Sequence, residues 1–320
     1  MSIKSLATMM KRKVFVALFG FVSMLAMGQQ DAQYTQYMYN TLSINPAYAG
    51  SREVFSSNAL YRSQWVGLDG APETQTFNVH APIKERLGLG LSIINDRLGN
   101  GTNQETQFHF MAAYHIPVSS EGKLAFGVNF GGSILNIDFS RLRLFDASSS
   151  LALQTAIDNK FSPNFGTGAY YYTQNFYIGA SVPNILETRY FDESDNAGVG
   201  FERMNAYLMS GVVVNLALDW KMKPAVLLKA VSGAPVQTDL SLNFLYAEKF
   251  TFGGAYRFGA AWSALGAYQI NPSVMIGLAY DTEITELGNT AFNNGSFEIF
   301  LRFEPQTWLE SMLYKSPRFF

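Results

Sequence analysis

The feature that most constrains this chain is a two-residue alternation of apolar and polar side chains. It is clearest at residues 249–258, KFTFGGAYRF, where the aromatic rings fall on one side and small or polar residues fall on the other. Successive side chains of a strand point to opposite faces, so this period indicates extended chain. Every strand in the wall of a membrane barrel needs one apolar face towards lipid.

Similar stretches recur along the chain, and their number is even. Each is close to the length that a tilted strand needs to cross a membrane, and closure into a barrel gives every backbone amide a partner. We therefore expect an all-β, transmembrane antiparallel β-barrel of about fourteen strands. The alternation is weakest in the eighth stretch, where three valines run together. The predicted strands are residues 54–65, 73–83, 86–96, 103–116, 123–137, 164–173, 176–182, 203–218, 222–231, 237–246, 249–258, 261–270, 274–282 and 296–303.

The connections between these strands alternate in length. Every second one is short, and the three long ones, residues 136–163, 183–202 and 283–295, all fall in the other set. Outer-membrane barrels have short periplasmic turns and longer extracellular loops. The sequence therefore predicts that the long loops face the outside of the cell.

Composition agrees with a membrane barrel and argues against a nucleic-acid partner. Charged residues are 15% of the chain, below the roughly 25% of soluble domains, and the net charge is only −2. Residues 1–28 resemble a cleaved signal peptide; an uncleaved anchor is the alternative. We expect residues 29–52 to form a periplasmic or lumenal segment, 53–304 the barrel and 305–320 a tail, in a protein of the bacterial outer membrane.

Most charges within the predicted strands fall on the face opposite the rings. They would point into the lumen, where they either fill the interior as paired or hydrated ions or line a selective pore. A basic side chain on the lipid face would cost about 2–4 kcal/mol at the bilayer midplane. The predicted lumen charges are Asp239, Arg257, Asp281, Glu298 and Arg302.

The chain has little that points to catalysis, a metal or a cofactor. His80, His109 and His115 also fall on the inward face, but the last two are about 20 Å apart along one strand. No serine lies in a Gly-x-Ser-x-Gly motif, although a barrel hydrolase could pair a serine with a histidine without one. We expect no enzymatic activity, no metal and no cofactor.

Two of the long loops mix charges with aromatic rings. They could clasp each other, or they could present rings and charges to a partner protein, since aromatic and arginine anchors dominate contact energies. The candidate partner-binding residues are Arg141, Arg143 and Phe145 in the first loop, and Arg189, Tyr190, Phe191 and Asp192 in the second.

Four blocks of the sequence resemble the PorP/SprF family of the type IX secretion system in Bacteroidetes. QYMYNTLSINPAYAGSRE at residues 36–53 resembles the opening motif of that family, and RSQWVGLDGAPETQTFNVHAPI at 62–83 resembles its next block. GLGLSIINDRLG at 88–99 is similar to the strand that follows, and KSPRFF at 315–320 to the usual ending.

This resemblance implies an outer-membrane barrel that serves protein secretion or gliding motility. It implies that the chain binds the carboxy-terminal domain of a secreted adhesin and supports its surface attachment. It also implies periplasmic ring or peptidoglycan-binding partners. The polar lumen alone leaves an alternative open, a solute or fatty-acid channel, and the segment 29–52 could plug such a lumen.

Overall fold

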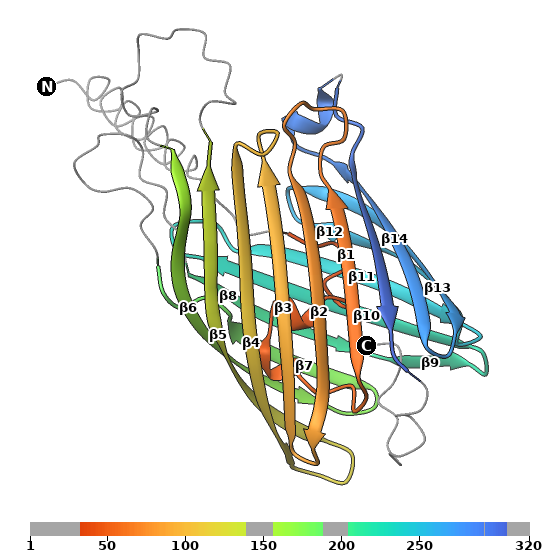
Figure 1. The fold of residues 1–320 in the computed structure, drawn as a ribbon. Coiled ribbons are helices and arrows are strands. Elements are labelled where there is room, and N and C mark those ends of the chain that lie inside the picture. The colour runs from red at the N-terminus through yellow and green to blue at the C-terminus, as the bar shows by residue number, and fades with distance from the viewer. Residues whose placement is uncertain (1–32, 139–155, 188–203, 291, 306–320) are drawn as a thin grey trace, which may run out of the picture.

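The computed structural model describes residues 33–138, 156–187, 204–290 and 292–305. These residues form an antiparallel β-barrel whose strands tilt around a filled interior (Figure 1). The strands are β1 (Ser56–Ser63), β2 (Glu73–Lys84), β3 (Leu87–Leu98), β4 (Asn103–Pro117), β5 (Lys123–Ile137), β6 (Ile157–Tyr172), β7 (Phe176–Val182), β8 (Asn205–Val212), β9 (Val214–Ala217), β10 (Trp220–Val231), β11 (Gln237–Tyr246), β12 (Phe250–Arg257), β13 (Ala261–Asn271), β14 (Val274–Glu283) and β15 (Ser296–Phe303).

The barrel is closed. Apart from β8 and β9, each strand pairs antiparallel with its neighbours in sequence, and β15 pairs with β1 from Ser57 opposite Phe303 to Ser63 opposite Phe297. Strands β8 and β9 both pair with β10, so together they make one position in the wall. Counted this way, the described residues form fourteen strands, which confirms the predicted number and fold class.

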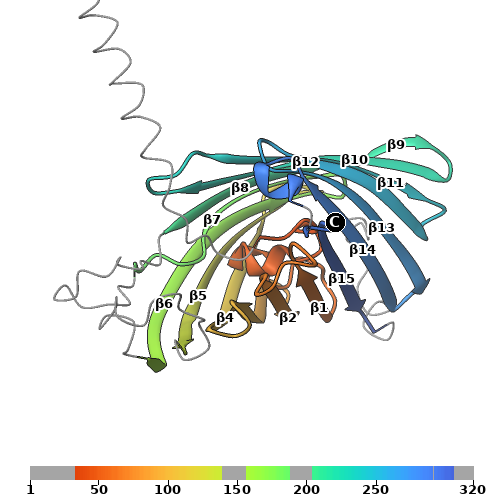
Figure 2. The same ribbon diagram turned by 90° about the horizontal axis from the view of Figure 1, so that it is seen from above.

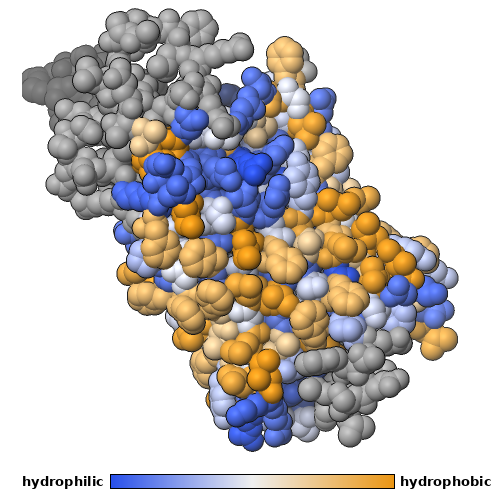
Figure 3. Space-filling view, viewed as in Figure 1, coloured by the Kyte–Doolittle hydropathy of each residue, from blue (hydrophilic) through white to orange (hydrophobic). Residues whose placement is uncertain are grey.

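The alternation predicted from sequence is seen as an outer apolar face and an inner polar face. On β12, Phe250 and Phe252 are 48% and 44% exposed, whereas Thr251 between them is 4% exposed. Neighbouring rings contact across strands, as between Phe250 and Tyr268 with centroids 5.0 Å apart. On the face that Figure 3 shows, hydrophobic side chains form a band across the middle of the wall, with hydrophilic patches nearer its two ends. This is the surface that lipid requires.

The two ends of the barrel differ. Connections 85–86, 118–122, 173–175, 218–219, 247–249 and 272–273 lie at one end, which we call the short-turn end. The opposite end, the long-loop end, carries the longer connections, including 64–72 and 284–295 with the 3-10 helix η6 (Glu286–Asn289). By the outer-membrane rule the short-turn end faces the periplasm.

Two predicted boundaries are wrong. Residues 157–163 belong to β6 and not to a long loop, although they contain polar residues and a proline. Proline is confined to edge strands, and β7 pairs with β6 only from Thr167 to Tyr172, so Pro163 lies on an edge. The predicted strand 203–218 is broken at Val213, whose side chain is buried while its backbone N–H donates to the carbonyl oxygen of Asn175.

Residues 33–52, which precede β1, run inside the barrel (Figure 2). They contain two 3-10 helices, η2 (Thr41–Ser43) and η3 (Pro46–Tyr48), and residues 34–52 are almost all buried. Among the described residues, no helix is both long and apolar enough to cross a membrane. We call residues 33–52 the plug. The sequence left two locations open for residues 29–52, the periplasm and the lumen, and the described part of this segment lies in the lumen.

Candidate functional site: the plugged lumen and its mouth

The plug packs against glycines on the inner face of the wall. A Cβ atom at Gly88 would lie 2.1 Å from the Ala49 carbonyl oxygen, and one at Gly127 would lie 2.2 Å from the Ala47 nitrogen. Gly168 likewise leaves room for the side chain of Asn45. These close approaches require glycine on three strands, β3, β5 and β6. The inward glycines therefore form a groove that admits the plug backbone.

Near the long-loop end, a buried arginine joins the plug to two strands. Arg62 on β1 lies 2.8 Å from Asp281 on β14 and 2.5 Å from Glu298 on β15. The backbone N–H groups of Thr35 and Gln36 donate to the Glu298 carboxylate at 2.6 and 2.9 Å. The Thr35 hydroxyl also donates to Asp281 at 2.6 Å. Two of the predicted lumen charges thus hold the plug.

The other predicted lumen charges are also engaged. Arg257 on β12 pairs with Asp239 on β11 at 3.0 Å and donates to the side chain of Gln33 in the plug. Arg302 donates to the sulfur of Met275 and lies over the ring of Tyr39 in the plug, 5.6 Å from its centroid. The five charges therefore act as paired or packed groups. Four of them contact the plug, and Asp239 pairs with one of those four, Arg257.

Another ion pair lies where the plug meets the short-turn end. Arg52 lies 2.6 Å from the carboxylate of Glu304, and the Ser56 hydroxyl donates to the same carboxylate at 2.9 Å. Burial alone would raise the pKa of Glu304. The charges of Arg52 and Arg302, with the hydrogen bonds from Arg52 and Ser56, outweigh burial and lower that pKa to about 2.

Two of the three histidines bind the plug backbone. The Gly50 N–H donates to His80 Nδ1 at 3.0 Å, and His115 Nε2 lies 2.8 Å from the Ala49 carbonyl oxygen. His115 Nδ1 lies 3.1 Å from the Tyr172 hydroxyl. Since a carbonyl oxygen only accepts, His115 donates through Nε2 and accepts through Nδ1. The described residues contain no group of three or more His, Asp or Glu side chains that could hold a metal ion.

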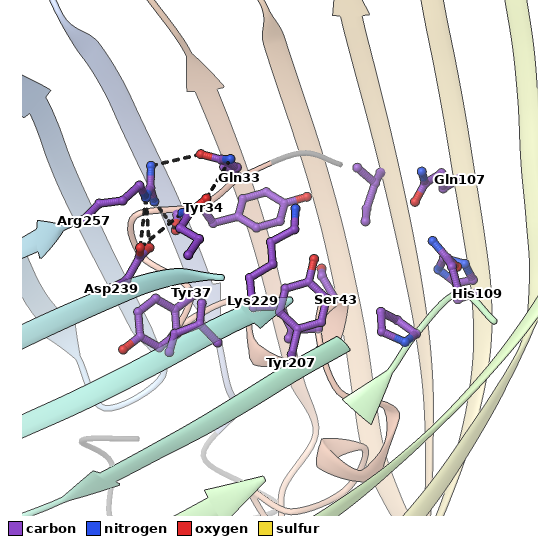
Figure 4. A pocket seen from close by; sticks show the side chains of 16 residues that line it. Gln33, Tyr34, Tyr37, Ser43, Gln107, His109, Tyr207, Lys229, Asp239 and Arg257 are labelled. Carbon is purple, nitrogen blue, oxygen red and sulfur yellow. Dashed lines mark hydrogen bonds and ion pairs between the residues drawn. The ribbon is translucent and has the colours of Figure 1, made fainter. Parts of the chain in front are cut away.

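A cavity of about 50 Å³ lies in the lumen above the plug. Figure 4 shows Tyr34 and Lys229 near its centre, with the Arg257–Asp239 pair on one side and His109 with Gln107 on the other. The Lys229 ammonium lies 5.8 Å from the centroid of the Tyr207 ring. Because plug residues form part of its wall, the cavity is a recess and does not show an open pore.

The family of the chain follows from its sequence. Residues 26–303 match the model of the type IX secretion system membrane protein PorP/SprF. The chain belongs to the PorP/SprF family. This match includes the plug and every strand of the barrel, so the family model covers both the plug and the wall that surrounds it. No curated protein sequence matches this PorP/SprF chain.

Several solved outer-membrane barrels are similar to this PorP/SprF protein in fold. The Ralstonia pickettii toluene transporter TbuX is 11% identical with a TM-score of 0.49, over 82% of this chain and 92% of that one. A Pseudomonas aeruginosa FadL homologue is 11% identical with a TM-score of 0.47, over 82% and 94%. Acinetobacter baumannii Omp33 is 10% identical with a TM-score of 0.46, over 79% and 100%. Likeness at this level carries no ligand over to this chain.

The predicted partner-binding residues lie outside the described residues. This applies to Arg141, Arg143 and Phe145, and to Arg189, Tyr190, Phe191 and Asp192. Sequence reasoning missed Arg62 and the inward glycines. The two-residue alternation could have predicted both. Arg62 falls in phase with the inward residues Asn58 and Leu60, and glycines recur on the polar face of three predicted strands.

Proposed function

We propose that this PorP/SprF protein is a non-enzymatic anchor of the outer membrane. It binds the carboxy-terminal domain of a secreted adhesin, supports secretion of that adhesin, and holds it at the cell surface during gliding. In this proposal residues 1–28 are a cleaved signal peptide, and the short-turn end contacts periplasmic ring or peptidoglycan-binding components.

The observation that supports anchoring over transport is the filled lumen. The plug is held near the long-loop end by the Arg62 cluster, near the short-turn end by the Arg52–Glu304 pair, and between them by the glycine groove. A barrel whose lumen is blocked by a plug leaves its two rims as the surfaces available to proteins. Membership of a type IX secretion system family supports the proposal that the partner is a protein of that system.

Deletion of the gene tests the proposal. Surface adhesin is measured by protease accessibility on intact cells, and shed adhesin is measured in the medium. The deletion strain should lose surface adhesin, either retaining it inside or releasing it, and the wild-type gene supplied in trans should restore display. Normal display in the deletion strain would overturn the anchoring role.

The alternative is a solute or fatty-acid channel, and it requires the plug to move. Plug and wall are joined by hydrogen bonds and ion pairs and also by a buried apolar cluster, in which Tyr48 of the plug contacts Tyr170 of β6, so movement of the plug would break all of these contacts. Purified protein in planar bilayers separates the two functions: the anchor should show no steady conductance, whereas a channel should conduct. A barrel hydrolase would release lysophospholipid from vesicles that hold the purified protein. Replacing the three histidines one at a time would then identify its base as the one whose loss abolishes that release.

A further inference from the structure

Three connections at the long-loop end are joined into one structure. The Val66 N–H donates to the Gly295 carbonyl oxygen and the Asn294 N–H donates back to Val66, both at 2.8 Å. The Gly99 N–H donates to the Gly70 carbonyl oxygen at 2.9 Å. We call residues 64–72, 99–102, 284–290 and 292–295 the outer platform. Its parts are far apart in sequence, and backbone hydrogen bonds hold them in one arrangement.

Side chains and glycines fix the outer platform further. The Trp65 indole N–H donates to Glu283 at 3.1 Å, and the Asn100 side chain donates to Asp69 at 2.7 Å. Gly67 has a φ of +104°, and a Cβ atom there would lie 2.3 Å from the Phe292 carbonyl oxygen. These residues come largely from the block at 62–83 that resembles the family. Barrel closure does not itself require a tryptophan or glycines in that loop.

Among its described residues, the outer platform exposes two large apolar side chains, Ile284 at 44% and Phe292, beside acidic ones. Phe292 is 69% exposed, more than the lipid-facing rings of β12 and β15. A ring so exposed on a preorganised loop has the character of an interface anchor. Among the described residues of the outer platform and the strand ends beside it, three acidic side chains are exposed, Asp69, Glu73 and Glu286, and one basic side chain, Arg97.

We propose that the outer platform is the docking surface for the adhesin domain. The matching surface of the partner has an apolar pocket that receives Phe292 and a rim of lysine and arginine side chains. The inference rests on the proposed function and names the part of the protein that performs it. Opposite charges across the rim speed association and select the partner, while the buried ring supplies the affinity.

Binding by purified full-length protein in detergent micelles tests the docking surface. The probe is the carboxy-terminal domain of the adhesin that the deletion strain fails to display. Phe292→Ala should weaken binding about tenfold, because loss of an interface anchor costs more than 1 kcal/mol. Gly67→Ala should weaken binding too, because it displaces Phe292 without removing the ring. Binding by wild-type protein should also weaken as salt is raised, because screening reduces rim electrostatics.

The matched control is Phe258→Ala. Phe258 is 54% exposed and lies at the same end of the barrel, in the β12–β13 connection outside the outer platform. Its replacement should change affinity by less than about twofold. Comparison of the gel migration of heated and unheated samples checks that each variant is a folded barrel. If wild type and Phe292→Ala bind equally well, the platform assignment is wrong and the anchoring role stands. If wild type does not bind the domain, both fail.

Discussion

Replacing Arg62 by alanine should destabilise the barrel strongly. Its guanidinium contacts Asp281 at 2.8 Å and Glu298 at 2.5 Å, and all three side chains are at most 2% exposed. Removing the arginine leaves two carboxylates facing each other in the lumen without their cation. Breaking a buried ion pair from one side costs about 3–5 kcal/mol. Since domains are stable by only about 5–15 kcal/mol, much of the folding free energy would be lost.

Guanidinium unfolding in micelles, followed by tryptophan fluorescence, measures this loss as a shift in the transition midpoint. The exposed Lys84→Ala variant is the control and should change the free energy of unfolding by less than about 0.5 kcal/mol. A triple variant, Arg62→Met with Asp281→Asn and Glu298→Gln, should regain much of the stability because it leaves no buried charge. A loss under about 1 kcal/mol for Arg62→Ala would refute the reasoning.

Three further predictions concern the plug and the orientation of the barrel. Gly127→Ala would place a methyl group against the plug backbone and should cost about 1–3 kcal/mol, whereas Gly266→Ala, with nothing within 4 Å, should be nearly neutral by the same unfolding assay. Glu304 has a pKa of about 2 in the folded protein against an ordinary 4.5, so its stabilising contribution is complete above pH 4.5 and is lost as pH falls towards 2. Glu304→Gln should therefore reduce the change of the unfolding free energy with pH over that range. An unchanged pH dependence in this variant would contradict the assignment. An epitope inserted at Gly259 should be detected on intact cells and one at Ser120 only after permeabilisation; the reverse labelling would invert the barrel.

Much of the wall could be predicted because its signal is local. Alternation along one strand reports which face meets lipid, whatever the other strands do. The last strand, Ser296–Phe303, was therefore placed correctly at both ends, and its inward charges Glu298 and Arg302 are buried. The start of β6 was missed because Pro163 and its polar neighbours are weak strand signals that pairing with β5 overrides.

Contacts across the lumen could not be predicted in this way. Arg62 meets Glu298 although 236 residues separate them, because closure of the barrel brings β15 beside β1. The plug has no regular period, so its sequence left its place open. Local alternation thus determined a sealed, amphipathic wall, while only the closed cylinder decided which inward side chains meet and that residues 33–52 fill the space between them. The physical reason is that strand faces depend on neighbours along the chain, whereas lumen contacts depend on curvature and closure.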